Sequence, residues 1–152
     1  MRSHRIRRSL NVACLAMLLA ACTSDTWYHQ YKFIGKDGWR KTDTLSFTLP
    51  PLSVDTVFSG FVGLRITPSF PYRKLWFALE YQCDSVFSSD TICYELSDST
   101  GRLDGKGLSS LQYEQPAFTI QMPKDKEGEI RIRHLMKKEI IPYIREVGIR
   151  LR

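Results

Sequence analysis

The feature that most constrains the fold is an alternation of apolar and polar residues that recurs along most of the chain. Leu75, Phe77 and Leu79 share one phase, for example, while Lys74 and Trp76 fall in the other. Successive side chains of a β-strand point to opposite faces of a sheet, so a period of two indicates strands with one face on a core. Runs of this kind predict about eight strands, at 28–34, 45–49, 55–67, 74–83, 92–96, 118–122, 130–132 and 147–151.

Short stretches rich in glycine, proline or charged residues separate these runs, and none is long enough to be an interdomain linker. We therefore expect one all-β domain over 30–152, an antiparallel β-sandwich of about eight strands with jelly-roll-like connections. The one helical candidate is 134–141, where Leu135, Lys138 and Glu139 are compatible with a turn or two of helix before Pro142.

The N-terminus predicts a secretory signal, because a basic head over 1–9 precedes an apolar segment over 10–21 that is shorter than a membrane span of about 20 residues. Its end, Leu19-Ala20-Ala21-Cys22, resembles the lipobox of bacterial lipoproteins. The resemblance implies that 1–21 is removed, that Cys22 carries a diacylglyceryl group, and that 22–29 is a lipidated tether. Two or three acyl chains anchor a protein durably. Threonine after this cysteine favours the outer membrane.

The net charge of +6 is concentrated in the discarded segment. Arg2, Arg5, Arg7 and Arg8 all precede the apolar run, so 18 basic and 16 acidic residues remain after it. A nucleic-acid binder needs its Lys and Arg excess on the folded domain. The composition therefore predicts no nucleic-acid partner.

Residue patterns typical of catalysis are weak throughout the chain. His29 and His134 lie far apart in sequence and lack acidic or thiol neighbours at the spacing of zinc ligands. The stretch from Gly101 to Gly107 has three residues between its first two glycines, where a phosphate-binding loop has four. No serine lies in a G-x-S-x-G elbow. We predict no enzymatic activity, no metal site and no cofactor.

Cys83 and Cys93 are candidates for a disulfide, since an oxidising envelope favours a bridge between adjacent strands. The alternation complicates this pairing. Cys83 shares the apolar phase of its strand, whereas Cys93 falls opposite in phase to Ile92 and Tyr94, so a direct bond needs a bulge or a two-sided strand. Both the bonded and the free state stay open.

Trp39, Tyr72 and Trp76 are the aromatic residues that could form a binding surface. Trp76 falls in the polar phase of its strand, and Tyr72 precedes it in a proline-bracketed loop. A second sheet or loop could cover these rings. Alternatively, they form an exposed patch that contacts a partner protein or stacks on sugar rings.

Four segments, in order, resemble the gliding-motility lipoprotein family GldH of the Bacteroidetes. These segments are Trp39–Phe47, Pro71–Phe77, Leu96–Gly107, and Arg133–Met136 followed by Ile144–Arg150. The resemblance implies a cell-envelope accessory protein of the gliding machinery and of type IX secretion, without catalytic residues. We therefore expect a lipid-anchored protein that binds other envelope proteins. The alternative is a glycan-binding surface lipoprotein that uses Trp39, Tyr72 and Trp76.

Overall fold

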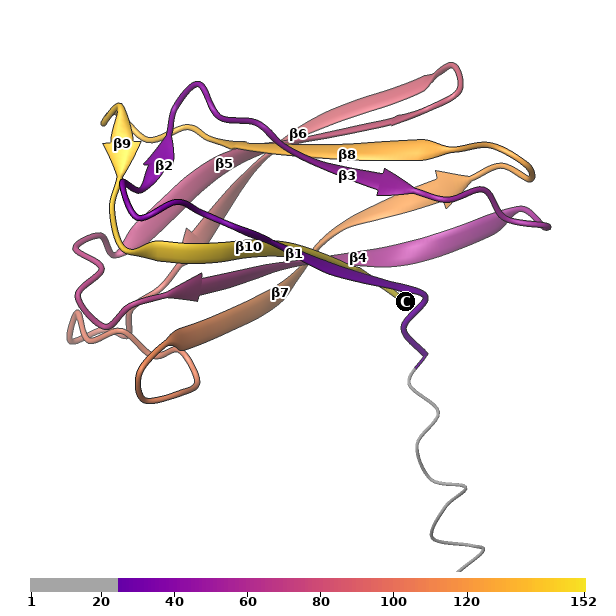
Figure 1. The fold of residues 1–152 in the computed structure, drawn as a ribbon. Helices are drawn as coiled ribbons and strands as arrows, with labels where there is room; N and C mark the ends of the chain where they lie inside the picture. The colour runs from indigo at the N-terminus through magenta and orange to yellow at the C-terminus, as the bar shows by residue number, and fades with distance from the viewer. Residues whose placement is uncertain (1–24) are drawn as a thin grey trace, which may run out of the picture.

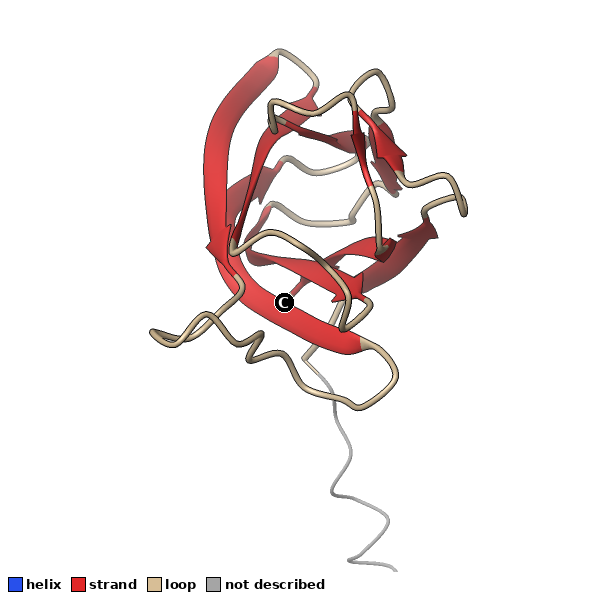
Figure 2. Cartoon of the chain, turned by 90° about the vertical axis from the view of Figure 1, so that its left-hand side faces the viewer, coloured by secondary structure: helices blue, strands red, loops and turns tan. Residues whose placement is uncertain are grey.

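The alternating runs fold into strands, as predicted. A computed structural model describes residues 25–152, in which all regular secondary structure is β and no helix occurs (Figures 1 and 2). Cys22, the signal segment and the first residues of the tether lie outside the described residues. The strands are β1 (Tyr28–Phe33), β2 (Trp39–Arg40), β3 (Leu45–Leu49), β4 (Thr56–Ile66), β5 (Lys74–Cys83), β6 (Val86–Glu95), β7 (Leu111–Met122), β8 (Gly128–His134), β9 (Ile140–Ile141) and β10 (Ile144–Leu151).

Two four-stranded antiparallel sheets form the sandwich, and the predicted jelly-roll topology is confirmed. The first sheet has the order β1-β10-β4-β7 and the second has the order β3-β8-β5-β6. Successive long strands mostly alternate between the sheets, which is the arrangement of a jelly roll. The two short strands β2 and β9 pair with each other outside both sheets.

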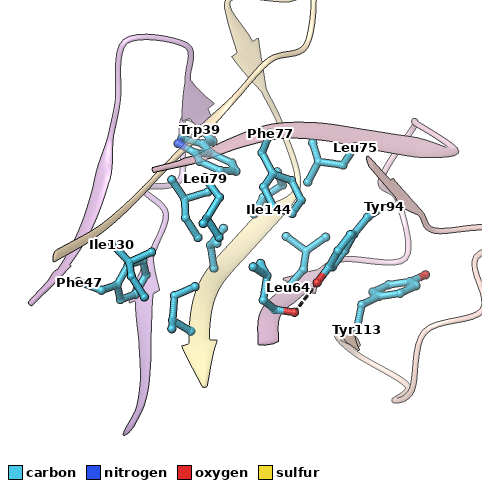
Figure 3. Packing of buried hydrophobic residues seen from close by; sticks show 14 of the residues in the cluster. Trp39, Phe47, Leu64, Leu75, Phe77, Leu79, Tyr94, Tyr113, Ile130 and Ile144 are labelled. Atoms are coloured by element: carbon cyan, nitrogen blue, oxygen red, sulfur yellow. Dashed lines mark hydrogen bonds between the residues drawn. The ribbon is translucent and has the colours of Figure 1, made fainter. Parts of the chain in front are cut away.

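The core lies between the inward faces of the two sheets (Figure 3). Phe47 on β3, Phe77 on β5 and Ile130 on β8 come from the second sheet, and Leu64 on β4 and Ile149 on β10 come from the first. All five are at most 2% exposed. These residues occupy the apolar phase of their strands, so burial of one face explains the alternation.

Three tyrosine hydroxyls cross the core and bond to backbone carbonyls of the opposite layer. Tyr94 donates to Val62 at 2.7 Å, Tyr113 donates to the carbonyl of Leu96 at 2.7 Å, and Tyr81 donates to that of Gln121 at 2.9 Å. A buried hydroxyl without a partner is costly, and here each one is satisfied by a carbonyl. These bonds fix the spacing of the sheets on the side where β6 and β7 form the edges.

The helix predicted over 134–141 is wrong. His134 ends β8, and Ile140 and Ile141 form β9, which pairs with Trp39 and Arg40 of β2. Two adjacent β-branched residues suit a strand, and burial of Ile141 beside Trp39 outweighs any local tendency to form a helical turn.

The alternating strand directions divide the connections between two ends of the sandwich (Figure 1). We call the end that holds Trp27 and the C-terminus the tether end; its connections are 50–55, 84–85 and 123–127. There the backbone N–H of Trp27 donates to Leu151 at 3.0 Å. We call the opposite end the far end; its connections are 34–44, 67–73, 96–110 and 135–143.

Candidate functional site

Trp39 belongs to the core, so its predicted place in an exposed aromatic patch is wrong. The side chain is 1% exposed, and its Nε1 donates to the backbone carbonyl of Asp43 at 3.1 Å. Its ring meets His134 edge-on with the centroids 5.4 Å apart. The pairing of β2 with β9 folds this segment over the far end of the core, which the isolated position of Trp39 in the sequence did not reveal.

Without Trp39, Tyr72 and Trp76 do not form the exposed aromatic patch. Tyr72 is half-buried and packs edge-on against Phe70, with ring centroids 5.5 Å apart. Trp76 is 45% exposed on the outer face of the second sheet, as its phase predicts. The three aromatic residues therefore do not form one surface, and the glycan-binding alternative loses the set of rings on which it rested.

Cys83 and Cys93 are free, so of the two states that the sequence left open the structure has the unbonded one. In the β5–β6 hairpin Cys83 lies opposite Val86, whereas Cys93 lies opposite Trp76. Cys93 lies seven residue steps along extended β6 from Val86, which corresponds to about 23 Å, far beyond the reach of a disulfide. The nine residues between the cysteines are mostly strand rather than loop, because β6 begins at Val86.

His134 is fully buried at the end of β8, and neither ring nitrogen has a hydrogen-bond partner. Burial lowers its pKa, since the charged imidazolium loses its hydration. His29 is exposed. Among residues 25–152 no group of three or more His, Cys, Asp or Glu side chains could hold a metal ion. Within the same range no helix is long and apolar enough to cross a membrane.

A groove at the far end is the candidate site that the sequence analysis missed. Two hollows of about 350 and 370 Å³ share Phe33 and Arg145 in their walls. Phe33 is 70% exposed and Tyr143 is 50% exposed. We call this surface the Phe33 groove. Its aromatic and cationic lining residues are Phe33, Lys36, Arg65, Tyr143 and Arg145, and its neutral polar and acidic ones are Thr67, Ser110, Gln112 and Glu146.

The orientation of β1 explains why Phe33 is exposed. Gln30 lies opposite Ile149 and Lys32 lies opposite Val147, so the polar residues of β1 take the inward face. The ammonium of Lys32 lies 5.6 Å from the ring centroid of Phe47, at the margin of the core. Because β1 is an edge strand, its polar side chains reach solvent from the inward face, and Phe33 points outward.

The charges around the groove are only partly neutralised. Arg65 pairs with Glu146 and also stacks on Tyr31, with its guanidinium carbon 4.4 Å from the ring centroid. Neither Lys36 nor Arg145 makes an ion pair with any residue that the structure describes. The groove therefore holds two uncompensated cations beside two exposed aromatic rings.

The backbone holds Tyr143 in a conformation that is unusual for a bulky residue, with φ at 66°. Such a conformation costs of order 1–3 kcal/mol and persists only where surrounding contacts enforce it. The N–H of Thr67 donates to the carbonyl of Tyr143 at 2.9 Å, and the N–H of Ile34 donates to that of Arg145 at 2.8 Å. These bonds fix the rim of the groove. The hydroxyl of Thr67, buried within it, has no hydrogen-bond partner.

Comparison with known proteins identifies the family. The family model named GldH lipoprotein matches residues 26–151. The chain belongs to the GldH lipoprotein family. It is similar to the gliding motility lipoprotein GldH of Flavobacterium johnsoniae, with 24% identity over 97% of each chain. The chain is thus a gliding motility lipoprotein by family, as the four sequence segments predicted.

Two solved structures show weaker likenesses. One is a family GH115 4-O-methyl-α-glucuronidase with specificity for decorated arabinogalactans, at 17% identity and a TM-score of 0.47 over 86% of this chain and 18% of that enzyme. The other is the dimeric latent PorU of Porphyromonas gingivalis, at 9% identity and a TM-score of 0.33 over 86% of this chain and 13% of that protein. This chain spans less than a fifth of either protein, and neither likeness carries an argument about function.

Proposed function

We propose that the protein is a lipid-anchored component of the cell envelope that serves the gliding and type IX secretion apparatus by binding other envelope proteins. The observation that carries this proposal is the match to a gliding motility lipoprotein over nearly the whole of both chains. A match of that extent covers the far end, the tether end and the core together.

The sequence at the N-terminus supports the anchor. Leu19-Ala20-Ala21-Cys22 fits a lipobox, and acylation of Cys22 would tie the domain to the outer membrane. Cys22 is followed by only four residues before Trp27, which is already bonded to β10.

The arrangement of side chains favours binding over catalysis. The titratable side chains with a shifted pKa are mostly tyrosines, and the causes are burial and structural hydrogen bonds. Perturbed groups in an active site would instead converge on a cleft. Protein binding needs only a shaped surface with aromatic and cationic side chains, and the far end provides one.

The proposal is tested by deleting the gene in the bacterium that encodes it and restoring either the wild-type chain or Cys22→Ser. Loss of spreading or of secreted type IX cargo on deletion, with rescue by the wild type, would support the role. Labelling with radioactive palmitate and membrane fractionation test the anchor, because Cys22→Ser should lose both the label and the membrane association. Normal spreading and secretion without the gene would contradict the role, and unchanged labelling of Cys22→Ser would contradict the anchor.

A further inference from the structure

We propose that the Phe33 groove binds an extended acidic segment of a partner envelope protein. A large apolar side chain of that segment would pack against Phe33 and Tyr143, and a neighbouring carboxylate would pair with Arg145 and Lys36. This inference rests on the proposed role in protein binding and adds to it the surface used and the chemistry of the partner.

The short distance from Cys22 to the domain places the groove at the end of the sandwich that is farther from the anchor. From Cys22 to Trp27 the chain can extend at most about 18 Å, so an acylated Cys22 keeps the tether end close to the membrane. The six residues of β1 then lead from that end to Phe33, which adds roughly 20 Å. Figure 1 shows the chain entering at the tether end, while the groove lies at the opposite end of β1. The groove would therefore face away from the anchoring membrane, where a protein can reach it and the lipid headgroups cannot.

The charge at the far end favours an acidic occupant. The connections of the far end carry eight basic and five acidic residues, whereas the tether end, with residues 25–27 and Arg152, carries three basic and five acidic residues. Arg145 and Lys36 add no ion pair within residues 25–152 and remain available. Charge complementarity of this kind steers association and selects partners of the opposite sign.

The chemistry of the groove favours a peptide over a sugar. The hollow around Tyr143, where the apolar anchor would bind, offers Thr67 as its only neutral hydrogen-bonding side chain besides the tyrosine itself, and it contains no Asp, Glu, Asn or Gln. Ser110, Gln112 and Glu146 line the neighbouring hollow, where Glu146 already pairs with Arg65. A sugar ring presents hydroxyls on most of its carbons and needs several such partners. Exposed Phe and Tyr rings with an arginine are instead typical of the anchor points of protein interfaces.

Crosslinking in intact cells tests the surface. In the full-length lipidated protein, p-benzoylphenylalanine at position 33 is expected to capture a defined envelope protein, and mass spectrometry should place the crosslink in a segment that contains Asp or Glu beside a large apolar residue. The matched control carries the same group in place of Phe87, which is 60% exposed on the β5–β6 hairpin near the tether end. Capture that is equal at both positions, or a crosslink in a segment without carboxylates, would overturn the inference.

Binding of defined probes tests the partner chemistry. The purified full-length protein in detergent micelles is titrated with ten-residue peptides of alternating Glu and Phe, and with matched peptides of Gln and Phe. We expect the Glu peptide to bind, and Arg145→Glu to weaken binding about tenfold or more. Lys138→Glu, which reverses one exposed far-end charge outside the groove, should change binding less than threefold. Equal binding of the Gln peptide, or retention on polygalacturonate or on phosphatidylglycerol vesicles without peptide binding, would overturn the proposal.

The outcomes separate this inference from the proposed function. If deletion of the gene stops spreading or secretion while Phe33→Ser with Arg145→Glu restores both, the envelope role holds and the groove proposal fails. If deletion has no effect on either process but the groove variants abolish capture and peptide binding, the groove proposal holds and the envelope role fails.

Discussion

The two ends of the sandwich are closed by connections that join the same set of long strands in different pairs, and they present different surfaces. The tether end has short connections, and its exposed apolar residues Val54, Val57 and Phe87 do not line the hollows of about 350, 370 and 510 Å³. The far end has longer connections, a net basic charge and these three hollows, of which the one of about 510 Å³ lies beside Phe70 and Leu108. The strands between the ends are constrained by the core, whereas the connections are not. Specific binding is therefore expected where the connections are long.

The largest effect on stability is expected at the far end, from removing the side chain of Trp39. Trp39→Ala deletes a ring that is 1% exposed and leaves a cavity between β2 and the core. We expect a loss of about 3–5 kcal/mol in the free energy of unfolding, measured by urea denaturation. Trp76→Ala is the matched control, because its ring is 45% exposed, and it should cost less than about 1 kcal/mol. Equal losses for the two variants would contradict the buried position of Trp39.

A smaller effect is expected between the two ends, where Tyr94 ties the sheets together. Its hydroxyl donates to the carbonyl of Val62 at 2.7 Å and lies 3.1 Å from that of Gln115. Tyr94→Phe removes the hydroxyl and its bonds to both carbonyls and should cost about 1–3 kcal/mol. Tyr72→Phe serves as the control, since no hydrogen bond from its hydroxyl is found among the described residues, and should be nearly neutral. A neutral Tyr94→Phe would mean that water replaces the bond.

The positions of most strands could be predicted from the sequence, but the surfaces at the two ends could not. Alternation located the strands that bury one face, such as 45–49 and 74–83, because packing on a core imposes the period. It underestimated β6, whose residues 86–91 are exposed on both faces and carry no alternation. The lipobox and the family resemblance depended on local sequence and needed no fold.

The site was not predictable in the same way. Trp39 was a candidate for an exposed patch because nothing in 39–40 signals its pairing with 140–141, a contact across about a hundred residues. Phe33 was not recognised as a surface residue, because the sequence does not show that the edge strand turns Gln30 and Lys32 to the inward face. Both positions depend on tertiary structure, which local patterns do not encode.

The pH dependence of stability provides a further test at the far end, where His134 packs under Trp39. Burial is the main cause that lowers the pKa of His134 below its ordinary value; the Trp39 backbone and the carboxylates of Glu139 and Asp43 oppose it, and the ammonium of Lys41 adds to it. The unfolded chain therefore binds the proton more readily than the folded chain, so the stabilisation is complete above about pH 6.5 and is lost as the pH falls.

The measurement is the free energy of unfolding between pH 7.5 and 5 for the wild type and for His134→Leu. The wild type should lose stability more steeply, by at most about 1.4 kcal/mol per pH unit for one proton. The difference between the two chains isolates this histidine from the carboxylates that both share. Parallel slopes would show that His134 does not titrate differently in the folded state.

The smallest effect on stability is expected from reduction of the two cysteines in the β5–β6 hairpin. Cys83 lies at its turn near the tether end, and Cys93 lies beside Trp76 towards the far end, so a bond between them would require the hairpin to unravel. Because both thiols are free, a reducing agent should leave the midpoint of thermal unfolding unchanged. The midpoint of the Cys93→Ser variant should be equally insensitive to the reducing agent. Titration of thiols in the denatured, non-reduced protein should detect both cysteines. A lower midpoint after reduction, together with one missing pair of thiols, would contradict the register of β5 with β6 and with it the division of this sheet between the two ends.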